Sequence, residues 1–318
     1  MRIAVLNNLR AGKNEAEVSR VLSLLRSYPD VLHIETDHAH ALPEALAEIA
    51  RQNVNLLVVN GGDGTLQFAL TEILSTGEFE RIPMIAPLRG GRTNMTALDL
   101  HARRNPVKGL RCLLEDARAG RLAERMVQRP VLRIQTMKAH HLQYGMFFGA
   151  GMIHRAVELT QRVFPQGKSQ GVFGAGLVTA SLCMRIAMRD NKGILTPYKI
   201  GILVNGEMVP QGEFHLVIAS SLERLFLRMN PFWGRENGGV RFTSMASSSL
   251  KMRSTIPGIL RGKPNDLVLP ENGYCSANSE KVELRLDCGF TVDGESFEPI
   301  SDEVVTITAD RRVTFVRA

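Results

Sequence analysis

Cysteine and aromatic residues are scarce in this chain. It has four cysteines, Cys112, Cys183, Cys275 and Cys288, and no two of them form a Cys-x-x-Cys pair. This spacing argues against a disulfide framework or a cysteine-based metal site, and predicts reduced thiols in the cytosol. Aromatic residues make up only 6% of the chain. We therefore expect no nucleic-acid binding, which needs aromatic side chains interleaved with basic ones.

Long apolar runs are also missing. No run reaches the roughly 18 apolar residues that a membrane-spanning helix requires. The first apolar run, residues 3–6, ends at the polar pair Asn7 and Asn8 and is too short for a secretion signal. We expect a cytoplasmic protein whose contact with a membrane, if it has one, is peripheral.

The charge and the length narrow the class of protein. Lys and Arg outnumber Asp and Glu by 39 to 32, and the sequence pI is about 9.5. This excess favours anionic partners such as phosphates and acidic lipid headgroups. At 318 residues the chain exceeds the size at which one hydrophobic core usually stops growing, which predicts two domains.

Strand and helix patterns alternate in the first third of the sequence and give way to short β-rich stretches after about residue 130. Alternating elements predict a Rossmann-like α/β domain with a parallel sheet, at residues 1–128. The later stretches predict a β-sandwich-like domain at residues 129–318, whose last strand could return to the first domain. The expected strands are 3–6, 32–36, 56–59, 82–86, 131–136, 144–148, 199–204, 214–219, 282–286, 304–308 and 313–316, and the expected helices include 15–27, 42–52 and 171–189.

The most informative motif is Gly61-Gly62-Asp63-Gly64-Thr65, which lies between an apolar strand and a helical pattern. Glycines let the backbone approach a phosphate, and the N-terminus of the following helix offers unpaired N–H donors to it. Asp63 adds a carboxylate that can hold Mg²⁺. The alternative is a tight structural turn in which Asp63 acts as a cap.

A second glycine turn follows the next expected strand, at residues 89–94. It contains Gly90, Gly91, Thr93 and Asn94. The two turns follow neighbouring strands, and open α/β sheets bind ligands at the carboxyl ends of their strands. We therefore expect both turns to contribute to one site.

The Gly61–Thr65 motif resembles the signature of the diacylglycerol kinase, sphingosine kinase and ceramide kinase catalytic domain, which is distantly related to NAD kinases. Residues 7–13 stand where this family has an Asn-Pro-x-Ser-Gly loop, and Thr36 where it has a nucleotide-contacting Thr. Residues 90–95 resemble its second glycine turn. The resemblance implies ATP contacts at Asn7, Gly12, Thr36, Gly61, Gly62, Gly64, Thr65, Gly90, Gly91, Thr93 and Asn94, and a Mg²⁺ ligand in Asp63.

Near the C-terminus, Asp293-Gly294-Glu295 resembles the family's Asp-Gly-Glu motif. The resemblance implies that Asp293 or Glu295 acts as general base, and accepts the proton of a lipid hydroxyl as its oxygen attacks the γ-phosphorus. Which of the two does so stays open. The alternative is an ordinary β-turn, in which Asp-Gly is common.

Two departures from the family pattern stand out. Met95 occupies the position after Asn94 where many members have an acidic residue, so the carboxylate network that supports the metal could be thinner. Residues 231–242, where the family often has an acidic metal site, contain only Glu236 and no Asp. We expect that second site to be degenerate or absent. Residues 149–151 do resemble the family's glycine bend at the start of the second domain.

Two segments combine apolar and basic residues, as interfacial segments do: 222–233 and 172–189. The alternative for each is a buried loop or helix with basic ends. The histidines His38, His40, His140 and His141 lack a cysteine or carboxylate set, so we interpret them as surface residues rather than metal ligands.

The resemblance as a whole implies an ATP- and Mg²⁺-dependent lipid kinase of phospholipid metabolism, acting at the inner face of the membrane on diacylglycerol, ceramide or a sphingoid base. Two alternatives remain: a soluble-substrate kinase of the NAD kinase type, and a non-catalytic nucleotide or lipid sensor. Exposed edge strands in the second domain would also allow a homodimer.

Overall fold

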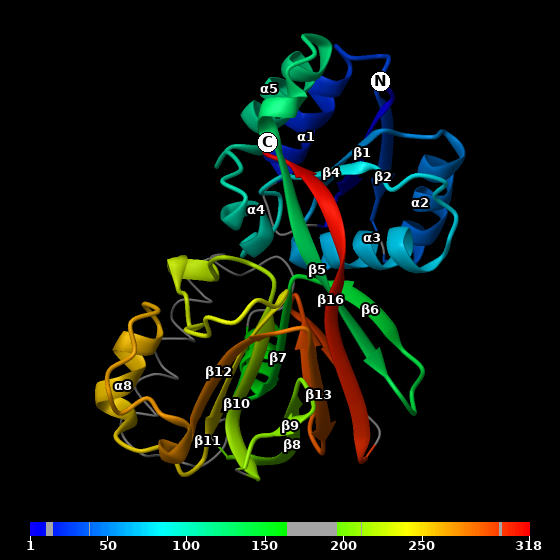
Figure 1. Ribbon diagram of the computed structural model, residues 1–318. Coiled ribbons are helices and arrows are strands. Elements are labelled where there is room, and N and C mark those ends of the chain that lie inside the picture. Colours follow the sequence, from blue (N-terminus) through cyan, green and yellow to red (C-terminus); the bar gives the residue numbers. More distant parts are fainter. Residues whose placement is uncertain (11–14, 38, 164–195, 211, 299–300) are drawn as a thin grey trace. The chain divides into compact units, whose positions relative to one another are not determined.

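The computed structural model describes residues 1–10, 15–37, 39–163, 196–210, 212–298 and 301–318. These residues form two compact units (Figure 1). Unit 1 contains Met1–Arg129 and Arg312–Ala318, apart from the undescribed positions, and unit 2 contains the described residues of 130–311. The expected helix at 171–189 lies outside the described residues.

Unit 1 is an α/β domain, as its alternating sequence pattern predicts. Its sheet has the order β2-β1-β3-β4-β16, and all four pairings are parallel. The elements are β1 (Ile3–Asn8), α1 (Glu15–Leu25), β2 (Leu32–Thr36), η1 (Ala39–Ala41), α2 (Leu42–Arg51), β3 (Leu56–Asn60), α3 (Asp63–Ser75), β4 (Met84–Pro87), α4 (Met95–Asp99), α5 (Pro106–Arg118), η2 (Leu122–Arg125) and the end of β16 (Glu303–Val316).

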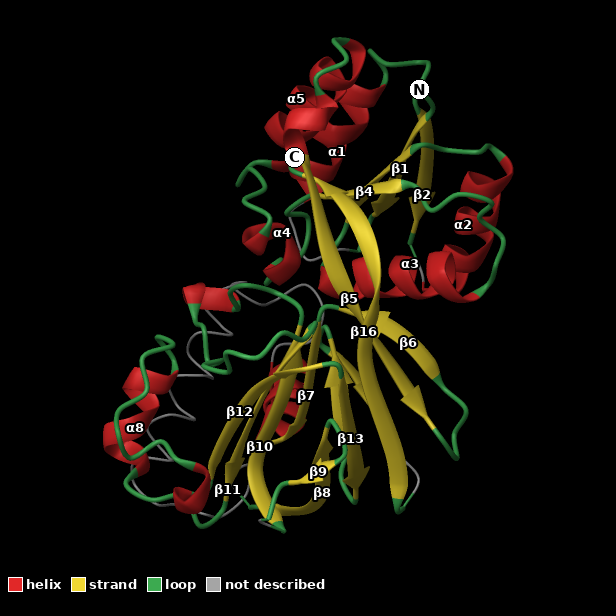
Figure 2. Ribbon diagram, in the orientation of Figure 1, coloured by secondary structure: helices red, strands yellow, loops and turns green. Residues whose placement is uncertain are grey.

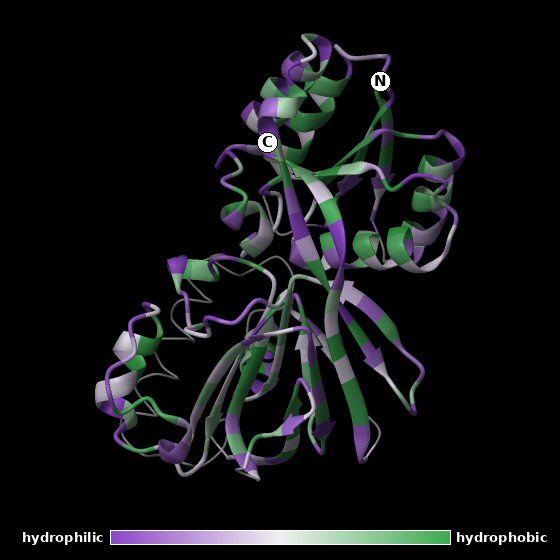
Figure 3. Cartoon of the chain, in the orientation of Figure 1, coloured by the Kyte–Doolittle hydropathy of each residue, from purple (hydrophilic) through white to green (hydrophobic). Residues whose placement is uncertain are grey.

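The central strand β3 is buried along its whole length, which explains its continuous apolar sequence, because helices cover both faces of a parallel sheet. Val5 of β1 and Val58 of β3 pack against Leu25 of α1 and Leu113 of α5 in one core. Helices α2 and α3 lie on the other side of the sheet from α1 and α5 (Figure 1). Helix α5 carries both hydrophobic and hydrophilic colours in Figure 3, as expected for a helix with one buried face.

The C-terminal strand β16 is a single strand, where the sequence predicts two strands at 304–308 and 313–316. Its middle residues are polar and exposed, so their hydropathy gives no strand signal, but the backbone stays extended and pairs with β5. The end of β16 belongs to unit 1, where Phe315 pairs with Ile85. The terminal Ala318 carbonyl accepts a hydrogen bond of 2.8 Å from the Arg103 amide.

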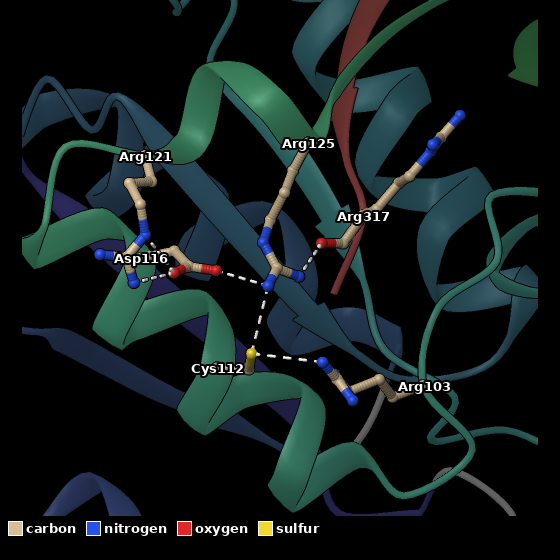
Figure 4. Close-up of polar contacts among 6 residues, drawn as sticks. All are labelled: Arg103, Cys112, Asp116, Arg121, Arg125 and Arg317. Atoms are coloured by element: carbon tan, nitrogen blue, oxygen red, sulfur yellow. Dashed lines mark hydrogen bonds and ion pairs between the residues drawn. The ribbon is translucent and has the colours of Figure 1, made fainter.

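Asp116 of α5 is buried and forms ion pairs with Arg121 and Arg125 (Figure 4). Hydrogen bonding from Arg121 is the largest influence that lowers the pKa of Asp116. Arg125 also donates to the Arg317 carbonyl at 3.2 Å and to Cys112 Sγ at 3.2 Å. These contacts tie helix α5 and the 3₁₀ helix η2 to the last strand of the chain.

Unit 2 is the β-rich domain (Figure 2). Its strands form two hydrogen-bonded groups, one around β7, β10, β11, β12 and β14 and one around β8, β13 and β16, joined by the short β8–β10 pairing. The elements are β5 (Met126–Thr136, which begins in unit 1), β6 (Leu142–Gly145), β7 (Phe147–Gly151), α6 (Met152–Val163), β8 (Tyr198–Val204), β9 (Glu207–Met208), β10 (Glu213–Ser220), η4 (Phe226–Arg228), β11 (Val240–Ala246), α8 (Met252–Ile259), η5 (Pro270–Asn272), β12 (Tyr274–Ser279), β13 (Lys281–Leu286), β14 (Phe290–Val292) and β15 (Glu295–Phe297).

Side chains from both strand groups fill one core, with Phe148 and Phe242 from the first group and Leu284 and Ile307 from the second. A shared core between two groups of strands is the arrangement of a sandwich, so the predicted fold class is confirmed. The expected strand 144–148 is in fact two strands that break at Met146, because the amide of Met146 donates to a side chain instead of a strand.

Candidate functional site

The polar residues that end β1 and β3 meet at one edge of the unit 1 sheet. Asn60 Nδ2 donates to Asn7 Oδ1 at 2.6 Å, and both residues are buried. Asn8 Nδ2 donates to Thr65 Oγ1 at 2.8 Å. Asn60 was not among the residues predicted from the sequence, although a polar residue that ends a fully apolar strand is a usable signal. This edge is where an open α/β sheet binds ligands.

Thr36 lies at the same edge, because it pairs in register with Asn8. Its side chain is buried, and within the described part of the chain Thr36 Oγ1 has no hydrogen-bond partner. A buried hydroxyl without a partner is costly, which makes Thr36 a candidate for a ligand contact. Gly12 lies outside the described residues.

The two predicted glycine turns contact each other through their backbones. A Cβ atom on Gly91 would lie 2.2 Å from Gly62 Cα, and one on Gly90 would lie 2.6 Å from Asn60 Oδ1. A Cβ on Gly61 would lie 2.6 Å from Thr65 Cβ. Three glycines of the motifs are therefore required by packing alone, whether or not a phosphate binds there.

Asp63 links the two turns. It is the first residue of α3, and its carboxylate accepts hydrogen bonds from the amides of Met95 (2.9 Å) and Thr96 (3.1 Å), which begin helix α4. Asp63 therefore caps the N-terminus of α4, which has no cap from its own Asn94 side chain. Burial raises the pKa of Asp63, and the amides of Met95, Thr96 and Asn94 oppose this effect.

The N-terminus of α3 itself is not capped by a side chain. Gly62 occupies its N-cap position in an extended conformation, and no side chain bonds to the first-turn amides from there. Asp63, Gly64 and Thr65 form the first turn, and the first amides of a helix have no partner within it. This helix end can donate hydrogen bonds to an anion.

Asn94 closes the second turn on itself. Its Oδ1 accepts from the Gly91 amide and its Nδ2 donates to the Gly91 carbonyl, both at 2.6 Å. Asn94 has a left-handed backbone with φ 51°, which Asn tolerates better than most residues. Thr93 is half-buried beside it, and the Met95 side chain is buried in the protein. The side chain that replaces the family's acidic residue is therefore part of the core.

A pocket of about 190 Å³, which includes space open to solvent, lies between the two turns. Its polar wall contains Gly61, Gly62, Asp63 and Asn94, and its apolar wall contains residues of β3, β4 and their following helices, such as Leu66. Most of this volume is open space, so the pocket is only a small hollow between the two turns, and a nucleotide-sized ligand would bind over it rather than inside it.

In unit 2 the predicted carboxylates Asp293 and Glu295 flank the turn between β14 and β15. Asp293 is buried, and its Oδ2 accepts a hydrogen bond of 2.8 Å from the Met146 amide. The Asp293 amide donates to the Phe147 carbonyl at 2.9 Å, and its φ is 49°. Asp293 therefore holds the junction of β6 and β7 to the turn.

Glu295 is in a different environment. The residue is exposed as a whole, but protein atoms surround part of its carboxyl group, and this partial burial raises the Glu295 pKa. A raised pKa moves a carboxylate toward the range in which it is an effective base at neutral pH.

The remaining residues singled out in the sequence differ in their surroundings. Glu236 accepts a hydrogen bond of 2.9 Å from the Asn278 amide. In segment 222–233, Leu225 and Phe232 are buried and Leu227 is 55% exposed. Segment 172–189 and His38 lie outside the described residues, while His140 and His141 are exposed. No described helix is both long enough and apolar enough to cross a membrane.

The chain thus has an α/β domain, in which a helix N-terminus of the kind that binds phosphate follows a glycine turn, and a β-rich domain after it. Residues 2–124 match the sequence model of the diacylglycerol kinase catalytic domain. This match confirms the resemblance carried by the Gly61–Thr65 motif and supports a lipid kinase in general. No curated protein sequence matches the chain.

Three solved structures from Bacillus anthracis str. Sterne share the fold along the whole chain. A candidate diacylglycerol kinase has 15% sequence identity and a TM-score of 0.68, and the match covers 100% of this chain and 96% of that one. A diacylglycerol kinase has 15% identity and a TM-score of 0.61 over 100% and 97%. A further candidate diacylglycerol kinase has 14% identity and a TM-score of 0.64 over 100% and 98%. At this identity the likeness concerns the fold.

Proposed function

We propose that the protein is an ATP- and Mg²⁺-dependent kinase that phosphorylates the hydroxyl group of a lipid such as diacylglycerol, ceramide or a sphingoid base. The observation that carries the proposal is the N-terminus of α3. Its first-turn residues Asp63, Gly64 and Thr65 follow a glycine turn at the carboxyl edge of a parallel sheet, inside a segment of the diacylglycerol kinase catalytic domain family. Such a helix end is suited to a phosphate chain.

The residues at this edge fit a magnesium nucleotide. Both oxygens of Asp63 accept backbone hydrogen bonds, and a carboxylate offers further lone pairs. Mg²⁺ prefers oxygen ligands and usually takes only one or two carboxylates together with substrate phosphates. In this proposal Asp63 would hold the ion, which supplies charge neutralisation on the phosphates, and the N-terminus of α3 would bind part of the phosphate chain.

We assign the role of general base to Glu295 and a positioning role to Asp293. The lipid hydroxyl oxygen forms a bond to the γ-phosphorus, the bond from that phosphorus to the β–γ bridging oxygen breaks, and ADP leaves. The hydroxyl proton passes to Glu295. The exposure and raised pKa of Glu295 support this assignment, whereas Asp293 is buried and bonded to Met146.

A peripheral contact with the inner face of a membrane belongs to the same proposal. Leu227 is 55% exposed at the tip of η4, and the exposed Arg224 and Arg228 lie beside it in the sequence. An exposed apolar side chain with basic neighbours favours an anionic lipid surface. Cosedimentation with vesicles containing phosphatidylglycerol should fall for Leu227→Ser and stay unchanged for Met208→Ser, an exposed control beside the acidic Glu207.

The proposed reaction is tested by transfer of radiolabel from γ-labelled ATP with Mg²⁺ to diacylglycerol, ceramide, sphingosine and phosphatidylglycerol in mixed micelles. We expect one of these lipids to carry the label, and Glu295→Gln to lose it. Glu207→Gln, an exposed substitution on β9, is the matched control. Label on NAD, added as a soluble acceptor, would replace this proposal with the NAD kinase type. ATP binding without any labelled acceptor would favour a sensor.

A further inference from the structure

A cluster of metal-binding side chains lies in unit 2, where helix α6 packs against the end of β15. His154 and Glu158 are one helical turn apart on α6, and residues at this spacing share a helix face. Glu298 follows directly after β15. One ligand atom of each of the three residues lies within 4.8 Å of the other two.

The histidine of this cluster is buried, with a relative exposure of 4%. Gly289 makes its position possible, because a Cβ atom there would lie 2.2 Å from His154 Cε1. One ring nitrogen, Nδ1, is 4.0 Å from Glu158 Oε2, and the other, Nε2, is 3.3 Å from Glu298 Oε1. A single ion binds only one of these nitrogens, and Nε2, the one closer to a carboxylate, is the candidate ligand atom.

The contact between His154 and Glu298 is close but is not a hydrogen bond. Within the described residues, His154 Nε2 is buried and has no hydrogen-bond partner, although a carboxylate oxygen is only 3.3 Å away. Two ligands about 2.1 Å from a shared tetrahedral ion lie roughly 3.4 Å from each other and point at the ion instead of at one another. This distance together with the missing hydrogen bond is what such a pair shows.

We propose that His154, Glu158 and Glu298 bind a divalent transition metal of the zinc type, with water completing the coordination. Imidazole suits zinc and its neighbours, whereas Mg²⁺ prefers sites made only of oxygen ligands. One imidazole and two carboxylates match the three protein ligands that many zinc sites use. The ion would also offset the negative charge of the two carboxylates beside a buried ring. Arg162, 3.7 Å from Glu158 Oε1, is 79% exposed and leaves that carboxylate accessible.

The position of the site suggests what the ion does. Gln161 of α6 donates a hydrogen bond of 3.2 Å to the Gly294 carbonyl, in the turn between β14 and β15. An ion held by His154 and Glu298 would add a second connection between α6 and this hairpin. It would thereby position the turn that carries Asp293 and Glu295. Metal binding itself does not depend on the proposed kinase activity.

Isothermal titration with zinc chloride tests the proposal on the full, tag-free chain after treatment with a chelator. We expect one zinc ion per chain, an affinity at least ten-fold weaker in Glu298→Gln and in Glu158→Gln, and a zinc-dependent rise in melting temperature that both variants lose. Glu298 is 72% exposed in its side chain, so its replacement should leave the fold intact. Magnesium chloride at the same concentration should give no heat that depends on these two residues.

Two controls separate this site from other zinc-binding groups. Glu207→Gln removes an exposed carboxylate of the same unit, and the double change His140→Gln with His141→Gln removes an exposed histidine pair. Both should keep the affinity of the wild type. Bound cobalt should give the visible spectrum of a low-coordinate site in the wild type and lose it in Glu298→Gln. No zinc binding by the wild type, or equal binding by the two cluster variants, would overturn the proposal.

Discussion

Two turns in this protein each place carboxylate side chains next to glycine, and they use them differently. In the turn at Gly61–Thr65, one carboxylate, that of Asp63, caps helix α4 and is also the candidate metal ligand. In the turn after β14, two different carboxylates have the structural role and the proposed catalytic role. Asp293 is buried and bonded to Met146, while Glu295 is exposed and has a raised pKa.

This difference shows at which residue a mutation can remove the proposed catalytic role without disturbing the fold. Substitutions of Asp63 affect a helix cap and the proposed chemistry together. Substitutions of Glu295 affect the chemistry with little effect on the fold, because the residue is exposed. Asp293 should behave as the structural partner of Glu295.

The largest expected effect is on turnover. Glu295→Gln should lower kcat by roughly 10²–10⁴, the contribution of a general base, and change the free energy of unfolding by less than about 0.5 kcal/mol. Asp293→Asn should instead lower the free energy of unfolding by about 1–3 kcal/mol, because it weakens a buried acceptor. Kinetics of lipid phosphorylation and urea unfolding measure the two quantities. If the Asp293→Asn enzyme has normal stability and no activity, Asp293 is the general base and Glu295 is not.

The second largest expected effect is on stability, at the contact between the two glycine turns of unit 1. Gly91→Ala places a Cβ atom 2.2 Å from Gly62 Cα and should cost roughly 3 kcal/mol of unfolding free energy, since backbone atoms cannot move aside easily. Gly62→Ala is the matched control, because its Cβ would meet its nearest atom, Gly91 Cα, at 3.5 Å. Thermal unfolding should place Gly62→Ala near the wild type. If Gly62→Ala is stable but inactive, that glycine serves the ligand rather than the fold.

Asp63 should show a smaller and mixed effect. Asp63→Ala removes the cap of α4 and should cost about 1 kcal/mol, while Asp63→Asn keeps one acceptor and should cost less. Both variants should lose Mg²⁺-dependent transfer if Asp63 holds the ion. Urea unfolding together with a Mg²⁺ titration of activity separates the two roles. An active Asp63→Asn enzyme with an unchanged Mg²⁺ requirement would leave Asp63 as a cap only.

The smallest expected effect is on pH dependence. The pKa of Glu295 is raised, so turnover should fall as the pH drops through this raised value, because a protonated carboxyl group cannot accept the substrate proton. A raised pKa also means that the stability contributed by this group is full below its ordinary pKa and is lost as the pH rises through the raised one. Glu295→Gln should therefore unfold at a slightly higher temperature than the wild type at neutral pH. An equal or lower melting temperature there would contradict the raised pKa.

The sequence by itself determined the architecture and the positions of the motifs. Continuous apolar runs such as residues 56–59, alternating with helical patterns, were enough to predict the α/β domain. A strand that is buried on both faces needs apolar residues at every position, and this is visible in the sequence. Strands β11 and β12 escaped prediction, because β12 contains small and polar residues and its pairing with β11 is decided by distant partners.

Only the tertiary structure decided what the motif residues contact. No local pattern could reveal that Asp63 caps a helix 32 residues further along the chain, that Gly62 touches Gly91, or that Asp293 is buried while Glu295 is exposed. In the cluster of His154, Glu158 and Glu298, Glu298 likewise lies 140 residues after Glu158 in the sequence. Such contacts depend on long-range packing, and a side chain's neighbours across the fold set its burial, its pKa and its role.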